Sequence, residues 1–106
     1  MNYKVIETET FTDLYRNLDE DEKNWLKKII QQLNQNPFVG KPLKSDWFRE
    51  KKYKNKRLYY LVYSKMNVVV LVAFAGKKEQ TEIIAHILLN LKDYESITKS
   101  VNEPPS

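Results

Sequence analysis

Hydrophobic positions in the first third of the chain alternate briefly and then recur at helical spacing. Residues 3–8 alternate weakly, which predicts a short first strand. Thr10 is a plausible N-cap for a helix over residues 11–18, and Asp19 caps a second helix that ends before Pro37. So short a turn between them predicts an antiparallel helical hairpin. The apolar stripes are Phe11, Leu14, Tyr15 and Leu18 in the first helix, and Leu26, Ile29, Ile30 and Leu33 in the second.

The rest of the chain is predicted as a loop, three strands and a helix. Residues 37–46 begin at Pro37, carry Gly40 and Pro42, and are expected to form the loop. The strands cover about residues 47–53, 57–63 and 67–75. Their turns are too short for a crossover, which predicts an antiparallel meander. The last strand is apolar without alternation, so we expect it to be covered on both faces. A helix follows over residues 80–92.

These elements predict an α+β fold with an N-terminal strand, a helical hairpin, a three-stranded antiparallel meander and a C-terminal helix. Residues 1–94 are expected to form a single domain, as is usual for a chain of 106 residues. The polar stretch 95–106, which ends in NEPPS, is expected to be a disordered tail.

Composition excludes several kinds of chemistry. The chain has no cysteine and one histidine, so neither a disulfide framework nor a zinc site is expected. We expect no metal and no cofactor. The longest apolar run, Val68–Ala75, is too short to span a bilayer, and the N-terminus lacks the pattern of a signal peptide. We therefore expect a cytoplasmic protein that does not contact a membrane.

Charge is concentrated in residues 41–57, which we call the basic segment. It holds eight basic side chains and two acidic ones, Asp46 and Glu50, for a net charge of +6, whereas the whole chain carries +4. The basic residues are Lys41, Lys44, Arg49, Lys51, Lys52, Lys54, Lys56 and Arg57. Basic residues interleaved with aromatic β-formers are typical of a surface that binds a polyanion, most often a nucleic acid.

The length of the turn within this hairpin decides which basic residues share a face. A three-residue loop over residues 54–56 places Tyr53 opposite Arg57, whereas a two-residue loop scatters the apolar residues across both faces. Burial therefore favours the three-residue loop. It gathers Arg49, Lys51 and Arg57 beside Tyr59, and leaves Phe48, Leu58, Tyr60 and Val62 on the other face. Glu50 then lies on the apolar face and needs a partner such as the Tyr60 hydroxyl.

Three crowded cations are stabilised by an anion between them, and arginine binds phosphate through two hydrogen bonds. Crowding also favours the neutral form of lysine, which can then act as a general base or acid. RNA carries its own nucleophile, the 2′-hydroxyl. Its cleavage needs a base, cations that stabilise the charge on phosphorus, and an acid for the leaving oxygen. Lysine and arginine can supply all three without a metal.

The order and spacing of three segments resemble the RelE/ParE superfamily of toxin–antitoxin toxins. The segments are NPFVGKPLK, KNKRLYYLVY and VVVLVAFAGKK, and the resemblance covers about residues 3–94. The ending GKKEQTEIIAHILLNLKDY is similar to the HigB-like branch. The resemblance implies an antiparallel sheet with the helical hairpin on one face and an active site on the opposite, concave face. It also implies a metal-independent endoribonuclease that cleaves mRNA, usually on the ribosome, and a cognate antitoxin that masks the basic face or displaces the last helix.

Carried over by position, the resemblance gives roles to four basic residues. Arg57 is expected to hold the scissile phosphate. Arg49 and Lys51 match a basic pair on the preceding strand, where a lysine can serve as base. Lys78 stands where RelE-like toxins place an arginine that stabilises transition-state charge. The further residues expected to contact RNA are Lys41, Lys44, Trp47, Lys52, Lys54, Lys56 and Lys77, although Trp47 could equally serve packing.

One position departs from the pattern. RelE-like toxins often carry a tyrosine, used for base stacking or proton transfer, where this chain has Ile84. His86 is a candidate substitute, and the alternative is a solvated histidine on the polar stripe of the helix. Two functions stay open: an mRNA endoribonuclease, or a non-nuclease protein that acts on DNA gyrase as ParE toxins do, or only binds its antitoxin. The basic segment favours the first, and Ile84 favours the second.

Overall fold

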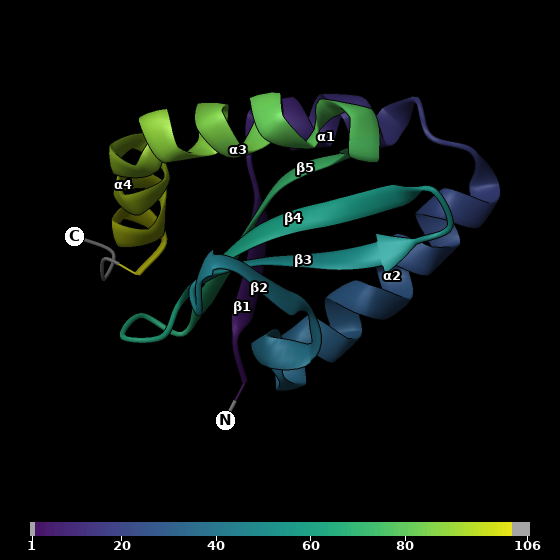
Figure 1. Cartoon of the computed structure of the whole chain (residues 1–106). Coiled ribbons are helices and arrows are strands. Elements are labelled where there is room, and N and C mark those ends of the chain that lie inside the picture. The colour runs from purple at the N-terminus through teal and green to yellow at the C-terminus, as the bar shows by residue number, and fades with distance from the viewer. Residues whose placement is uncertain (1, 103–106) are drawn as a thin grey trace.

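The computed structural model describes residues 2–102, which form one five-stranded sheet with helices on both faces (Figure 1). The strand order is β1-β5-β4-β3-β2; β1 runs parallel to β5, and the other neighbours are antiparallel. The strands are β1 (Lys4–Glu7), β2 (Lys41–Ser45), β3 (Phe48–Tyr53), β4 (Lys56–Tyr63) and β5 (Val68–Gly76). The helices are α1 (Glu9–Arg16), α2 (Glu20–Gln35), α3 (Gln80–Leu89) and α4 (Leu91–Asn102), with short 3-10 turns η1 (Pro37–Val39) and η2 (Lys77–Glu79). The predicted α+β class, first strand, helical hairpin and meander are confirmed.

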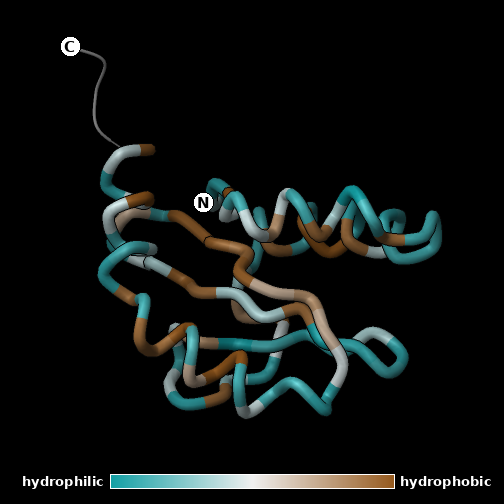
Figure 2. The backbone as a smooth tube through the Cα atoms, turned by 90° about the horizontal axis from the view of Figure 1, so that it is seen from above, coloured by the Kyte–Doolittle hydropathy of each residue, from teal (hydrophilic) through white to brown (hydrophobic). Residues whose placement is uncertain are grey.

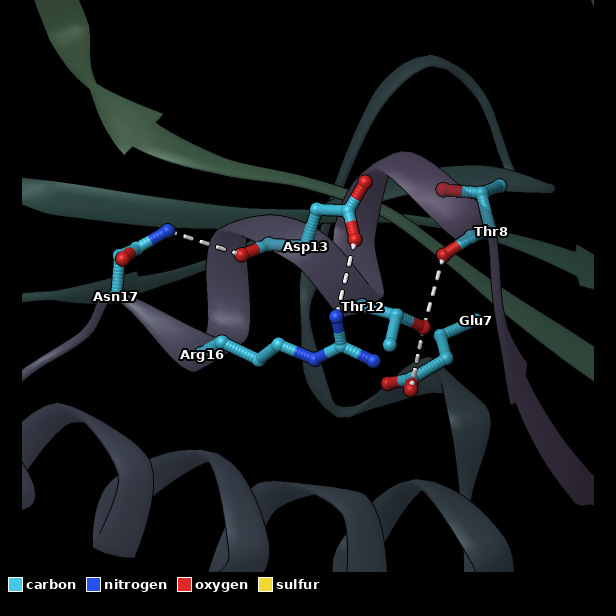
Figure 3. A network of polar contacts seen from close by, with 6 residues as sticks. All are labelled: Glu7, Thr8, Thr12, Asp13, Arg16 and Asn17. Carbon is cyan, nitrogen blue, oxygen red and sulfur yellow. Dashed lines mark hydrogen bonds and ion pairs between the residues drawn. The ribbon is translucent and has the colours of Figure 1, made fainter.

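Side-chain caps fix the starts of both N-terminal helices. The Thr8 hydroxyl accepts a hydrogen bond from the Phe11 amide at 3.1 Å, so α1 begins earlier than expected and the predicted cap at Thr10 is wrong. Thr12 adds a 2.7 Å hydrogen bond to the Glu7 carboxylate, which ties the first turn to β1 (Figure 3). In α2 the predicted cap at Asp19 is confirmed as a reciprocal capping box with Glu22.

Two hydrophobic clusters lie on opposite faces of the sheet. The first joins α1 and α2 to one face, and its buried members include Phe11, Leu26, Ile29, Leu33, Leu58, Tyr60 and Val62. The second joins α3 and α4 to the other face and includes Phe48, Tyr59, Leu61, Ile87 and Tyr94. Strand β5 contributes alternate residues to both, which confirms that it is covered on two sides (Figures 1 and 2). The central strands therefore carry apolar side chains on both faces of the sheet.

The stretch predicted as a loop contains an edge strand. Residues 37–39 form η1, and β2 then pairs with β3, with Lys41 opposite Glu50 and Pro42 opposite Arg49. Two lysines and a proline concealed this strand, but such residues are usual on a sheet edge, where they discourage pairing with another chain. The loop prediction for residues 37–46 is therefore wrong.

The C-terminal region holds two helices where one was predicted. Helix α3 ends at Leu89, and α4 continues to Asn102. The predicted disorder is wrong for residues 95–102, and residues 103–106 lie outside the described range. Tyr94 and Thr98, one helical turn apart, are buried against the sheet and explain why α4 forms. None of the helices within residues 2–102 is long and apolar enough to cross a membrane.

Gly40 lies where no side chain has room. A Cβ atom there would lie 2.4 Å from the Glu50 carbonyl oxygen and 2.5 Å from the Tyr60 hydroxyl. The first of these neighbours is backbone and the second is a buried ring, so neither can yield cheaply.

We expect Gly40→Ala to lower the free energy of unfolding by about 1–3 kcal/mol through overpacking. Gly76→Ala is the matched control, since its Cβ would meet its nearest neighbours at ordinary distances of 3.4 and 3.5 Å. Urea unfolding of both variants measures the effect. Equal stability of the two variants would contradict the packing at Gly40.

Tyr63 lies at the end of β4 beside α4. Burial, together with the nearby Glu95 carboxylate and Tyr94, raises the pKa of Tyr63 to about 12. Because the folded state favours the neutral phenol, this contribution to stability is complete below pH 10 and is lost as the pH rises from 10 through 12.

We therefore expect the wild-type protein to lose more stability than Tyr63→Phe as the pH rises from 9 to 12. Denaturant unfolding at several pH values measures the difference, and absorbance titration of the tyrosines checks its cause. A constant difference between the two proteins across this range would rule out the ionisation of Tyr63 as its source.

Candidate functional site

The β3–β4 turn has two residues, Lys54 and Asn55. Tyr53 pairs with Lys56, and Lys52 pairs with Arg57, so the predicted three-residue loop and its register are wrong by one position. Lys54 adopts a left-handed backbone conformation with φ of 53° to close the turn. The physical reason is that helices cover both faces of the sheet. A two-residue turn distributes the apolar residues over both faces, and both faces need them for burial.

This register separates the basic residues that were predicted to share a face. Arg49 and Lys51 pair with Tyr60 and Leu58 on the side of α2, whereas Arg57 lies on the side of α3. The predicted common face of Arg49, Lys51 and Arg57 is therefore wrong.

Arg49 is a buried structural residue, 8% exposed. Its Nε and Nη2 atoms donate to the Gly40 carbonyl at 3.2 and 2.7 Å. Nη1 donates to the Asp46 carbonyl at 3.0 Å, and Nη2 also reaches the Phe38 carbonyl at 3.2 Å. Tyr60 fixes the same segment, because its hydroxyl donates to Pro37 and accepts from the Gly40 amide. Arg49 thus holds η1 and β2 against the sheet, and we leave it out of the candidate site.

Arg57 lies in a polar cluster on the other face. Its Nε atom lies 3.5 Å from the Glu50 carboxylate, and both side chains are mostly buried, at 14% and 11% exposed. The Gln80 amide, at the first position of α3, donates to the same Glu50 oxygen at 2.9 Å. The cluster therefore ties the N-terminus of α3 to β3 and β4 around one carboxylate.

Tyr59 of β4 is the fourth member of this cluster. It pairs directly with Glu50 across the two strands and is fully buried. Its hydroxyl forms no hydrogen bond within the described residues, although the side chain of Gln80 lies beside it. Burial, together with the negative charge of Glu50, raises the pKa of Tyr59 above its ordinary value of 10. The hydroxyl thus keeps its proton at neutral pH.

A groove of about 310 Å³ opens beside this cluster. It is lined by Val39, Gly40, Lys41, Glu50, Lys51, Lys52 and Arg57, so four basic side chains surround one acidic one. Lys41 and Lys52 pair with Glu50 and Arg57 respectively and share their face, and Lys51 reaches the groove from the other face. Its reach is possible because β2 starts opposite Glu50 and leaves the end of β3 as a free edge. The groove can bind an anion and offers a carboxylate for proton transfer.

The other basic residues lie outside this groove. Lys56 forms an ion pair with Glu22 of α2 at 2.5 Å, on the face opposite Arg57. Lys54 lies at the turn with its amine 5.3 Å from the centre of the Tyr53 ring. Lys44 is exposed on β2, and Lys77 and Lys78 are exposed in η2. Gly76, just before η2, pairs with Lys56, so η2 starts at the same end of the sheet as Arg57.

His86, Ile84 and Trp47 also lie away from the groove. His86 is exposed on α3 and lines a different cavity, of about 420 Å³, between α1 and α3. Ile84 packs against the second hydrophobic cluster. Trp47 is 40% exposed and precedes β3, about 17 Å along the strand from Lys52 at ~3.4 Å per residue. The predicted catalytic role of His86 and the predicted RNA-binding role of Trp47 stay predictions.

Sequence reasoning did not assign functional roles to Glu50, Gln80 or Tyr59. Glu50 could have indicated this cluster from the sequence, since an acid inside a strongly basic strand needs a cationic partner. The partner proposed from the sequence, the Tyr60 hydroxyl, is wrong because Tyr60 lies on the other face and bonds to Pro37 and Gly40. Within residues 2–102, no group of three or more His, Cys, Asp or Glu side chains is arranged to hold a metal ion.

Comparison with solved structures identifies the fold as that of the RelE toxins. The E. coli toxin RelE, a double-substituted variant in its free state, matches with a TM-score of 0.67 and 24% identity over 80% of this chain and 93% of that one. A RelBE toxin–antitoxin complex from Mycobacterium tuberculosis matches with a TM-score of 0.63 and 21% identity. The match covers 73% of this chain and 100% of that one. An archaeal RelE–RelB complex from Pyrococcus horikoshii matches with a TM-score of 0.65 and 15% identity. The match covers 73% of this chain and 97% of that one. No family model and no curated relative matches the chain. The chain therefore has a RelE-like fold.

We expect Arg49→Lys to lower the free energy of unfolding by about 2–4 kcal/mol, because a single ammonium cannot replace the fork of bonds to three carbonyls. Arg16→Lys, on an exposed arginine of α1, is the matched control and should change little. Urea unfolding measures both. If Arg49→Lys were as stable as its control, the guanidinium would not hold the 37–46 segment.

Proposed function

We propose that this protein is the toxin of a type II toxin–antitoxin pair and that it cleaves mRNA as a metal-independent endoribonuclease. The observation that carries the proposal is the cationic groove in which Arg57 lies beside the Glu50 carboxylate. The RelE-like fold supports it, since the matched structures are described as toxins and as toxin–antitoxin complexes. A cognate antitoxin is accordingly the proposed protein partner.

The groove suggests a division of labour in the reaction. A phosphodiester bound there contacts Arg57, Lys41 and Lys52, which stabilise the additional negative charge on phosphorus. Glu50 accepts the proton of the 2′-hydroxyl as its oxygen attacks phosphorus. The bond from phosphorus to the 5′-oxygen breaks, and a protonated groove lysine, Lys52, supplies the proton to that leaving oxygen. The products are a 2′,3′-cyclic phosphate and a 5′-hydroxyl end.

Other residues of the basic segment would bind RNA without reacting. Lys51 lines the groove, the exposed Lys54, Lys77 and Lys78 lie at the end of the sheet that carries Arg57, and Lys44 is exposed further along β2. They would attract the RNA backbone in a salt-dependent way. We place the reaction on the ribosome in the cytoplasm, where mRNA is held extended.

A second function has its own supporting observations. Arg57 is already paired with Glu50, and Ile84 is an apolar residue packed on the core rather than a hydroxyl-bearing one. Both favour a protein that binds a partner without cutting RNA, for example DNA gyrase, or an inactive relative that binds only its antitoxin.

Arg57→Ala is expected to reduce RNA cleavage by about 100- to 1,000-fold, since it removes the cation closest to the proposed scissile phosphate. Sequencing of new 5′-hydroxyl ends measures cleavage in two arms, free RNA with EDTA and translating ribosomes with magnesium. Arg16→Ala, an exposed arginine on α1, should cleave like the wild type.

The two arms separate the alternatives. Cleavage in EDTA would support the absence of a metal requirement, and cleavage only in the second arm would support dependence on the ribosome. RNA that stays intact with wild-type protein in both arms would overturn the nuclease, and an assay of gyrase supercoiling would then test the alternative. Undiminished cleavage by Arg57→Ala would overturn the site but not the activity.

A further inference from the structure

The Tyr59 hydroxyl is a buried polar group that the resting structure leaves unpaired. The residue is fully buried, and within residues 2–102 no hydrogen-bond partner reaches its oxygen. Buried polar groups are nearly always paired, because an unpaired one costs stability. A buried hydroxyl of this kind inside a candidate site is available to form a hydrogen bond when the site changes.

Glu50 is the group whose needs change when the site is occupied. In the free protein the mostly buried carboxylate is held by Arg57 at 3.5 Å and by Gln80 at 2.9 Å. A phosphate in the adjoining groove competes for the same guanidinium, which binds phosphate through two parallel hydrogen bonds. As Arg57 turns toward the phosphate, Glu50 loses its cation while it remains buried, and a buried carboxylate needs another donor.

Tyr59 is placed to be that donor. It lies directly opposite Glu50 in the β3–β4 pairing, which brings the two Cβ atoms to within about 5.5 Å. The raised pKa of Tyr59 keeps the proton on its oxygen. Its hydrogen is also uncommitted, so donation to Glu50 breaks no existing bond.

We propose that Tyr59 is a positioning residue that donates a hydrogen bond to Glu50 when a bound phosphate draws Arg57 away. The proposal rests on the function proposed above, because it takes an RNA phosphate as the ligand of the groove. Tyr59 does not touch the RNA; it keeps the Glu50 carboxylate oriented and satisfied in the occupied site.

The test compares Tyr59→Phe with wild-type protein in two measurements that do not depend on catalysis. The first is the melting temperature of the free protein, which should be unchanged or higher, because phenylalanine removes an unpaired hydroxyl. The second is the Kd for an RNA with a 2′-deoxy residue at the cleavage site, which binds but cannot react. We expect this Kd to rise about 10-fold or more, as for the loss of a hydrogen bond to a charged group.

Two further variants show whether Tyr59 acts through Glu50. In a Glu50→Gln background, Tyr59→Phe should change the Kd by less than about twofold, because the neutral amide does not need the additional donor. Tyr63→Phe, a tyrosine of the same strand outside the groove, should leave the Kd unchanged. A lower melting temperature or misfolding of Tyr59→Phe, or an equal loss of affinity in the Glu50→Gln background, would make Tyr59 a packing residue and overturn the inference.

The outcomes separate this inference from the proposed function. Wild-type protein that cleaves RNA while Tyr59→Phe binds the deoxy RNA equally well overturns the role of Tyr59 alone. Wild-type protein that binds the deoxy RNA but never cleaves overturns the nuclease, and an increased Kd for Tyr59→Phe then still supports the hydrogen bond. Wild-type protein that does not bind RNA overturns both.

Discussion

Burial on both faces of the central strands is the constraint on which the rest of this structure depends. Strand β4 sends Leu58 and Tyr60 toward α2, and Tyr59 and Leu61 toward α3 and α4. A sheet covered on one side would place its apolar residues on one face only, but two covered faces require them on both. This requirement selects the two-residue turn. The turn then determines that Arg49 is buried, where it holds η1 and β2 against the sheet, and that Arg57 faces the groove.

The sequence predicted those parts of the fold that depend on local patterns. The capping box at Asp19, the apolar run of β5 and the antiparallel order of the meander follow from local signals and were confirmed, whereas the length of the β3–β4 turn was wrong. The wrong predictions concerned elements that are stabilised by partners outside the element itself. Strand β2 is a strand because β3 lies beside it, and α4 is ordered because the sheet buries Tyr94 and Thr98. Neither pairing can be read from the residues of the element itself.

The candidate site follows the same division. Charge alone indicated the basic segment, and four of its eight basic residues line the groove. The segment could not show that Arg49 donates its hydrogen bonds inward to carbonyls. It also could not show that Gln80, thirty residues further on, reaches Glu50. Within this basic segment, the buried acid Glu50 is a better guide to the polar cluster than the lysines are, because a buried carboxylate requires partners such as Arg57 and Gln80.

The parallel pairing of β1 with β5 has a consequence for the order of synthesis. The ribosome releases β1 well before its partner strand β5, which begins only at Val68. Strand β4 also needs β5, and Gln80 follows later still. Such long-range pairings form late and slow the folding of a domain. A nascent chain therefore cannot assemble the Glu50 cluster until β5 and Gln80 have both left the exit tunnel, so Arg57 and Glu50 meet in their final arrangement only after these later residues have been made.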